Sequence, residues 1–544
     1  MASTLQRYAH PALFVDELIF EFLQHLHRSK SSIDKADINA AGLTCKAWRD
    51  PALAVRWQEA DLKSLLSVLA PLRASDPEDQ PSVWSFAHVP KDRDHHRFHD
   101  IASRVHFLSF GGYSRFEESV FATISNGLPA ESTVLLPNLR SARFAGDGRF
   151  VRRFTEKVTR LLPFCPPSLR QLTLSLLPGL PRSRETLLRS LTSRFSRLST
   201  IDFHRAACVQ ADVGPMVELL EHNPDLRHVT IKQTVLSVTV DALSKLPHLE
   251  SLDIKSDALN EPLDYWTYPP GGPFPQLKSL TLQLPLDAGV FDLVANIGAH
   301  HSLQTLSMVS PYIHPIQLDL GAAVDAVVKH RQLRNLSFRQ LLFPTSQVKA
   351  LQAISACTTL ESLEINIMMT SDTPVMSTAN TSIADKVVGD LLQHLPHLTE
   401  LTLSFKDSNS SEPLLTFRAL AMAVVHCPLL ACAALVIDTR VPIALAPVSK
   451  HNERRRILDF SFTASGVDDS PIDDPKHVAD VLTQLCPDVD IRMKKDLYGR
   501  YRWGDVAKIL SRSHDVPDTE VRNELRPVTD ASLAVTESIQ EISK

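Results

Sequence analysis

The chain has 544 residues, more than one hydrophobic core usually organises, so it must form several domains or a repeat array that grows along one axis. Hydrophobic residues make up 44% and charged residues 22%, which is ordinary for a folded protein and excludes a disordered one. The formal net charge of −5 supplies no global basic field, and this argues against nucleic acid or an anionic membrane as a partner.

Two further features of the composition bear on the compartment. The seven cysteines lie far apart, as expected of reduced thiols that pack in a core. The first ten residues contain no apolar segment behind a basic start, so we expect no secretory signal. Together these features predict a cytoplasmic or nuclear protein.

The first predicted unit is a small helical module over residues 8–62. Apolar residues recur at helical spacing in two stripes, and Asp50-Pro51 is typical of the start of a third helix. The first stripe comprises Leu18, Ile19, Phe22, Leu23 and Leu26, and the second comprises Ile38, Ala41, Cys45 and Trp48. Three short helices cannot bury so many large residues among themselves, so part of this surface should meet something else.

The run from Ala40 to Leu53, with Trp57 after it and the Glu17-Leu18 helix before it, resembles the F-box of fungal F-box proteins. The resemblance implies docking on a Skp-type adaptor within the core of a cullin-type ubiquitin ligase, with the rest of the chain holding a substrate. By the same resemblance, the adaptor-binding residues would be Leu18, Ile19, Phe22, Leu43, Cys45 and Trp48. The alternative is that these helices only cap the domain that follows.

Residues 63–98 are predicted to be the end of a helix followed by a linker. Arg73 to Arg97 is rich in Pro, Asp and His and has no apolar periodicity. His95 and His99 would share a helix face and could bind zinc, but no fourth ligand at a fixed spacing accompanies them. We therefore expect an exposed linker and no metal.

A repeat dominates the remainder of the chain, over residues 99–510. Its pattern is Leu-x-x-Leu-x-Leu, usually preceded two residues earlier by Pro, and successive copies lie 23 to 38 residues apart. The first positions of the good copies are Leu169, Leu198, Leu226, Leu249, Leu277, Leu303, Leu333, Leu360 and Leu398. Weaker copies begin at Val105, Leu139, Leu430, Ile457 and Cys486, as expected of capping repeats.

Each copy reads as a short strand that buries its alternate leucines, followed by a helix such as Val213 to His222. Stacked copies predict an α/β fold, a leucine-rich-repeat solenoid with a curved parallel sheet inside and helices outside. The Asn or Cys usually found eight positions after the first leucine is missing from the good copies, so we expect irregular curvature.

Ala419 to Val436 is uncharged, but His426 and Pro428 favour a helix-to-strand turn over a membrane span. Residues 511–544 are polar and are predicted to form a mobile tail.

The outward positions of the predicted strands are the candidate substrate surface. His204, Lys232 and Lys255 fall on consecutive repeats and suggest a small patch for an acidic or phosphorylated segment, and Arg339 falls in the same column. No phosphate-binding loop, metal site or catalytic group is evident. The sequence thus predicts a non-enzymatic substrate receptor that needs no cofactor and binds an unknown protein; the alternative is a repeat scaffold outside any ligase.

Overall fold

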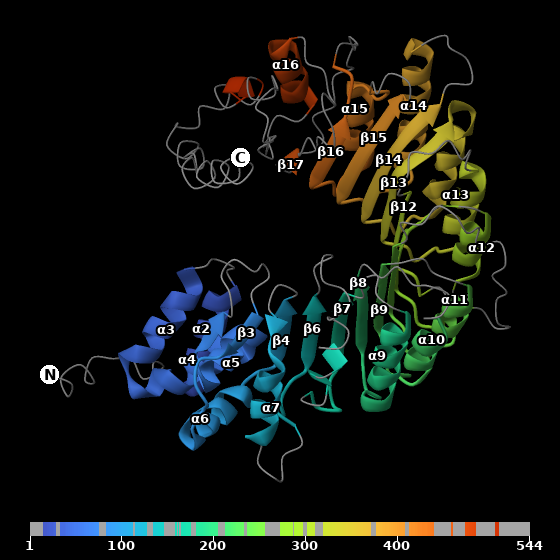
Figure 1. Cartoon of the computed structure of the whole chain (residues 1–544). Helices are drawn as coiled ribbons and strands as arrows, with labels where there is room; N and C mark the ends of the chain where they lie inside the picture. The colour runs from blue at the N-terminus through green and yellow to red at the C-terminus, as the bar shows by residue number, and fades with distance from the viewer. Residues whose placement is uncertain are drawn as a thin grey trace, which may run out of the picture. The chain divides into compact units, whose positions relative to one another are not determined.

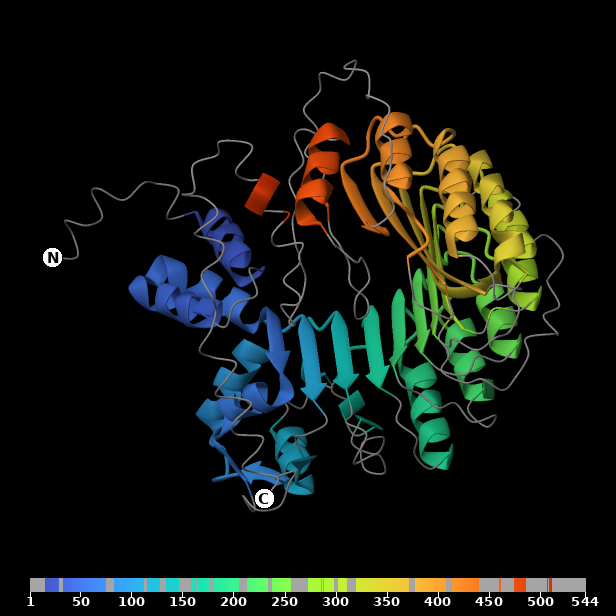
Figure 2. The ribbon, with the colours of Figure 1, turned by 90° about the horizontal axis from the view of Figure 1, so that it is seen from above.

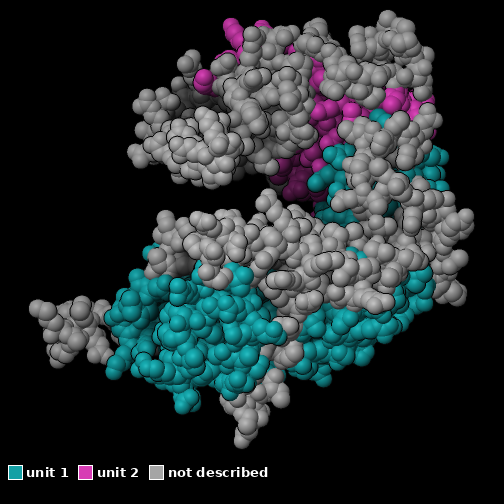
Figure 3. Space-filling view, viewed as in Figure 1, with its two compact units in different colours: residues 1–343, 356–360 teal, residues 344–355, 361–544 magenta. Residues whose placement is uncertain are grey.

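The computed structural model falls into two compact units, Met1–Phe343 with Ala356–Leu360 and Pro344–Ser355 with Glu361–Lys544 (Figure 3). We call them unit 1 and unit 2. The residues that the structure describes are 15–28, 33–74, 83–111, 115–127, 134–145, 158–159, 161–162, 165–175, 181–204, 213–232, 237–255, 273–284, 286, 288–297, 302–310, 319–370, 377–407, 413–439, 459–460, 474–485, 506 and 508–510.

The N-terminal module of unit 1 consists of α2 (Asp16–Arg28), α3 (Ile33–Thr44) and α4 (Lys46–Gln58) (Figure 1). These helices surround a core of their own, formed by Ile19, Leu23, Ile38, Ala52 and Val55. The predicted bounds of the second and third helices need correction. The second apolar stripe is split by extended backbone at Cys45, so Trp48 belongs to α4, and Pro51 lies inside that helix rather than at its first position.

The predicted linker over residues 63–98 also needs correction, because much of it is folded. Strand β1 (Glu59–Asp61) continues directly into α5 (Leu62–Leu69), which buries four leucines on one face. Asp61 caps the start of this helix, because its side chain accepts a 2.9 Å hydrogen bond from Ser64 N. Strands β2 (Leu72–Ala74) and β3 (Val83–Phe86) pair, and α6 (Asp92–Ala102) follows. The buried face of α6, with Phe98 and Ile101, was concealed by its charged first turn.

The repeat strands of unit 1 form one parallel ladder in the order β1-β4-β6-β7-β8-β9-β10-β11-β12-β13. Their bounds are β4 (Phe107–Gly111), β6 (Ser141–Ala145), β7 (Gln171–Ser175), β8 (Thr200–His204), β9 (His228–Lys232), β10 (Ser251–Lys255), β11 (Ser279–Gln283), β12 (Thr305–Val309) and β13 (Asn335–Pro344). Leucines alternate with part-exposed polar residues, as Leu280 and Leu282 do in β11. Every predicted strand in this unit is therefore present, and β1 is an additional one.

The helices that follow the repeat strands of unit 1 lie along one side of this ladder (Figure 2). They are α7 (Glu118–Asn126), α9 (Pro181–Arg194), α10 (Val213–Glu221), α11 (Ser237–Ser244), α12 (Ala288–Asn296) and α13 (Leu320–Val328), and the short β5 (Arg115–Phe116) pairs with β3. Neighbouring helices such as α9 and α10 pack together. The strand–turn–helix unit predicted from the spacing of the leucines is confirmed, and the chain is a leucine-rich-repeat solenoid of the α/β class.

Unit 2 repeats the same organisation with β14 (Ser362–Thr370), β15 (Glu400–Asp407), β16 (Cys432–Val436) and β17 (Asp459–Phe460), all parallel. Its helices are the 3-10 helix η4 (Thr345–Ala356), α14 (Ser377–Leu392), α15 (Phe417–His426) and α16 (Pro475–Leu485). The uncharged stretch from Ala419 to Val436 is therefore a helix, a turn and a strand, as predicted. Among the described residues, no helix has both the length and the apolar character to cross a bilayer.

Some sequence predictions fall outside the described residues. The copy that begins at Cys486 and the tail over 511–544 are among them. So are most of the positions eight residues after the first leucine, on which the expectation of irregular curvature depends. That expectation stays a prediction.

Candidate functional site: an apolar helical face and a polar strand face

An exposed apolar face distinguishes the N-terminal module. Of eight large hydrophobic side chains that are exposed among the described residues, four belong to the module, namely Val15, Leu18, Phe22 and Leu43. Leu43 is 87% exposed at the end of α3, and the exposed Cys45 follows it at the junction with α4. Exposed apolar groups gathered in one small module are a feature of surfaces that bind partners.

The six predicted adaptor-binding residues divide into a core part and a surface part. Ile19 is only 2% exposed and packs in the module core, whereas Leu18 and Phe22 lie one helical turn apart and are each more than half exposed. The Phe22 ring meets the half-buried Trp48 ring edge-on, with the ring centroids 6.1 Å apart. The surface part thus comes from all three helices.

The module is structurally distinct from the residues that cover the end of the repeat sheet. Its core is formed only by α2, α3 and α4, while the sheet begins with β1, which pairs with β4. The apolar face of α5, with Leu62, Leu65 and Leu66, packs beside β1 and β4. The first strand of the solenoid is thus covered by β1 and α5, and α2 and α3 are not needed for that purpose.

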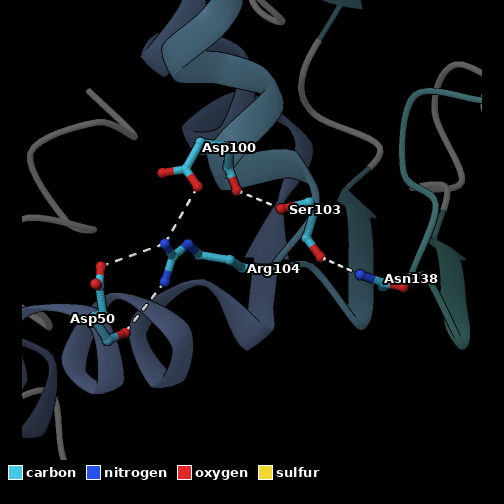
Figure 4. Close-up of polar contacts among 5 residues, drawn as sticks. All are labelled: Asp50, Asp100, Ser103, Arg104 and Asn138. Atoms are coloured by element: carbon cyan, nitrogen blue, oxygen red, sulfur yellow. Dashed lines mark hydrogen bonds and ion pairs between the residues drawn. The ribbon is translucent and has the colours of Figure 1, made fainter. Parts of the chain in front are cut away.

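Arg104 joins the module to the start of the solenoid (Figure 4). Its guanidinium donates to the backbone oxygen of Asp50 on α4 at 3.3 Å and lies 3.2 Å from a carboxylate oxygen of Asp100 on α6. Next to it, the Ser103 hydroxyl donates to the Asp100 backbone oxygen, and the Asn138 amide donates to the Ser103 backbone oxygen, each at 2.7 Å. These bonds tie α4 to the chain that enters the repeats.

The structure brings together two of the four predicted substrate-binding residues. Lys232 Nζ lies 2.6 Å from His204 Nδ1, and His204 Nε2 lies 2.6 Å from a carboxylate oxygen of Asp202. Burial lowers the pKa of His204; Lys232 and Arg143 lower it further, and Asp202 opposes them. A neutral imidazole therefore bridges a carboxylate and an ammonium group across β8 and β9.

The other two predicted substrate-binding residues lie farther along the same column. Lys255 is the register partner of Lys232, but its ammonium pairs with Asp253 on its own strand at 2.9 Å. Arg339 lies three strands beyond Lys255, about 14 Å away at the usual spacing of strands. Asp202 and Asp253 offset the positive charges of this column, and its binding role stays a prediction.

The histidines considered for zinc pack against the neighbouring helix. His99 Nε2 lies 3.3 Å from the backbone oxygen of Gly127, which ends α7, and the His95 ring lies where a side chain at position 127 would project. Within the described ranges, no group of three His, Cys, Asp or Glu residues is arranged to hold a metal ion.

Reasoning from sequence missed a row of basic residues at the entry to the strands. In many repeats of unit 1, the residue directly after the first leucine is basic and exposed: Arg140, Arg170, Arg227, Lys278 and Arg334. We call this set the basic row. Its signal is present in the printed sequence as Leu-Arg or Leu-Lys at the start of five motifs, but the sequence analysis considered only the leucines and the outward strand positions.

The repeating unit and its register define a leucine-rich-repeat protein. No protein-family model matches the sequence. No curated protein matches it either.

Solved structures with a similar fold include the leucine-rich-repeat protein LegL7 from Legionella pneumophila, at 11% identity and a TM-score of 0.33 over 67% of this chain and 97% of that one. The internalin InlF from Listeria monocytogenes has 14% identity and a TM-score of 0.30 over 61% of this chain and 81% of that one. TLR13, solved as a complex with ssRNA13, has 15% identity and a TM-score of 0.32 over 72% of this chain and 54% of that one.

Proposed function

We propose that this protein is the substrate receptor of a cullin-type ubiquitin ligase. The N-terminal module would dock on a Skp-type adaptor, and the strand face of the repeats would hold a protein target. Such a receptor contributes proximity rather than bond chemistry. The resemblance of residues 40–57 to an F-box motivates the proposal.

One structural observation carries the proposal: the module has its own core and yet leaves large apolar side chains exposed. Leu18 and Phe22 on α2 and Leu43 on α3 are exposed apolar side chains of the kind that are buried on association. If the module were only a cap, its apolar groups would be expected to face the sheet. Strand β1 and helix α5 cover the first repeat strand, and α4 contacts β1 and α6, so α2 and α3 with their exposed apolar side chains are not required as a cap.

The proposal is tested by co-purification of the full-length chain with a Skp-type adaptor. We expect Leu43→Asp and Phe22→Asp to abolish association, because a carboxylate buried at an apolar interface loses its hydration. Leu429→Asp is a matched control, since Leu429 is also about half exposed but lies in unit 2. Failure of the unmodified chain to associate, or equal association of all three variants, would refute the adaptor role.

A further inference from the structure

The basic row is spaced by the geometry of the sheet. Backbone hydrogen bonds link the equivalent position of each repeat to the next: Arg170 N donates to Arg140 O at 3.0 Å, and Lys278 N donates to Glu250 O at 2.8 Å. Equivalent residues therefore stand one strand apart, about 4.8 Å. Arg170, Arg227, Lys278 and Arg334 precede β7, β9, β11 and β13, so they recur on alternate strands, at intervals of about 9.6 Å.

The net charge of the basic row is opposite in sign to the net charge of the whole chain. Between its members stand Ser199, Gln304 and one acid, Glu250. The Glu250 carboxylate lies 3.1 Å from Arg227 and 2.9 Å from Lys278, and these two cations hold its pKa below the ordinary range. Five basic residues against one carboxylate give the row a net charge of +4, whereas the whole chain carries −5.

The packing of the repeat core does not require basic residues at this position, although Arg170 donates to the backbone oxygen of Arg197 at 3.3 Å and both Arg227 and Lys278 pair with Glu250. All five side chains are exposed, and the leucine that precedes each one supplies the packing. In unit 2 the same position holds Glu361, Thr399 and Ala431 in equally regular repeats. Because the backbone tolerates acidic, neutral and apolar residues there, the clustering of cations in unit 1 points to a ligand.

We propose that the basic row binds an extended acidic protein segment whose Asp or Glu residues recur about every third position. An extended chain rises about 3.3 Å per residue, so three residues span about 10 Å and match the interval between alternate strands. Each carboxylate would then meet one guanidinium or ammonium group. The inference rests on the proposed function in one respect only: the acidic segment is taken to belong to the protein target of the substrate receptor.

A single-stranded nucleic acid fits the strand face less well. Such ligands need aromatic side chains on which bases can stack. The outward positions of β7 to β11 carry Ser, Thr, Gln, Asp, His and Lys, without a Phe, Tyr or Trp among them. The lack of aromatic side chains at these outward positions therefore favours an acidic peptide over a single-stranded nucleic acid.

The test is a fluorescence-anisotropy titration of the full-length protein with labelled peptides of about twelve residues, long enough to span the row. One peptide carries Glu at every third position, a second has the same composition with its Glu residues in one block, and a third replaces Glu by Lys. Labelled oligo-uridine serves as the nucleic-acid probe. The variants are Arg170→Gln/Lys278→Gln and, as a charge-matched control away from the row (the helix variant), Arg189→Gln in α9 with Lys245→Gln directly after α11.

We expect the spaced acidic peptide to bind most tightly, with the row variant weakened about fivefold or more and the helix variant unchanged. Affinity should fall as salt is added, because the contacts are exposed. Equal binding of spaced and blocked peptides, tighter binding of oligo-uridine, or an unaffected row variant would overturn the proposal. If the adaptor co-purifies but no acidic peptide binds, this inference fails while the adaptor role stands; peptide binding without adaptor association supports the inference alone.

Discussion

The guanidinium of Arg104 lies 3.3 Å from the backbone oxygen of Asp50, which precedes it by 54 positions in the sequence. The same guanidinium also pairs with Asp100, so one side chain contacts both α4 of the module and α6 at the start of the solenoid. The Arg104 side chain is 23% exposed, but the side chains of Asp50 and Asp100 are 79% and 60% exposed, so water screens the two ion pairs and their contribution to stability is modest.

Arg104→Gln should loosen this junction. The shorter, uncharged side chain cannot reach both partners, and we expect a loss of about 1 kcal/mol in local stability. Hydrogen exchange of the α4 and α6 amides should quicken about fivefold, with α13 unaffected. Arg189→Gln, which removes only a pair with Glu185 within α9, is the control, and unchanged exchange in α4 and α6 would contradict the prediction.

The two sides of the module should respond differently to truncation. Ile19→Ala leaves a cavity in the module core and should cost about 2–5 kcal/mol, seen as early thermal melting of α2 to α4. Leu43→Ala should change stability by less than about 0.5 kcal/mol, because that side chain is already in water, and yet it should weaken adaptor binding. Similar melting of the two variants would argue against a separate exposed face.

Asp385 should make unit 2 sensitive to pH. Its buried carboxyl accepts hydrogen bonds from the Thr416 amide and hydroxyl at 2.9 and 2.6 Å, but burial raises its pKa. The folded state then holds a proton that the unfolded state has released, so stability falls as the pH rises through this window. The melting temperature of Asp385→Asn relative to the parent should therefore rise as the pH increases above the ordinary titration range of an aspartate. A difference that does not vary with pH would contradict this.

His204 should give the opposite pH dependence of stability. Its pKa is lowered in the folded state, chiefly by burial, so the unfolded chain binds the extra proton more readily. Stability is lost as the pH falls below the ordinary histidine range. His204→Gln should reduce that loss, as seen by comparing melting temperatures of variant and parent at about pH 7.5 and pH 5.5. NMR titration of the His204 ring gives the pKa directly, and a raised value would contradict the prediction.

Thiol labelling should separate the cysteines by burial. Burial raises the pKa of Cys165 to about 12 and that of Cys357 to about 11, so both should stay unmodified by iodoacetamide in the folded protein. Cys45 is exposed and should react first among the cysteines that the structure describes. Bound adaptor should protect Cys45 if the module docks through this face. Mass spectrometry of digested samples gives the order, and early labelling of Cys165 would contradict it.

The sequence alone determined the repeat, its strands and the buried leucines. A period-two pattern that recurs at intervals of 23 to 38 residues admits few arrangements, because each unit can bury its apolar face only against its neighbours. It also located the helical module and the residue types on its surface. For the same reason it predicted correctly that Ala419 to Val436 is part of a repeat.

Only the tertiary structure decided which apolar residues of the module face its core. Leu18 and Ile19 are adjacent in sequence, yet Ile19 is buried and Leu18 is half exposed, because α3 and α4 cover one side of α2 only. The tertiary structure also decided which side chains of the strand face pair with one another. Strand register and side-chain reach pair Lys255 with Asp253 and join His204 to Lys232, whereas sequence spacing identifies only the column in which these residues lie.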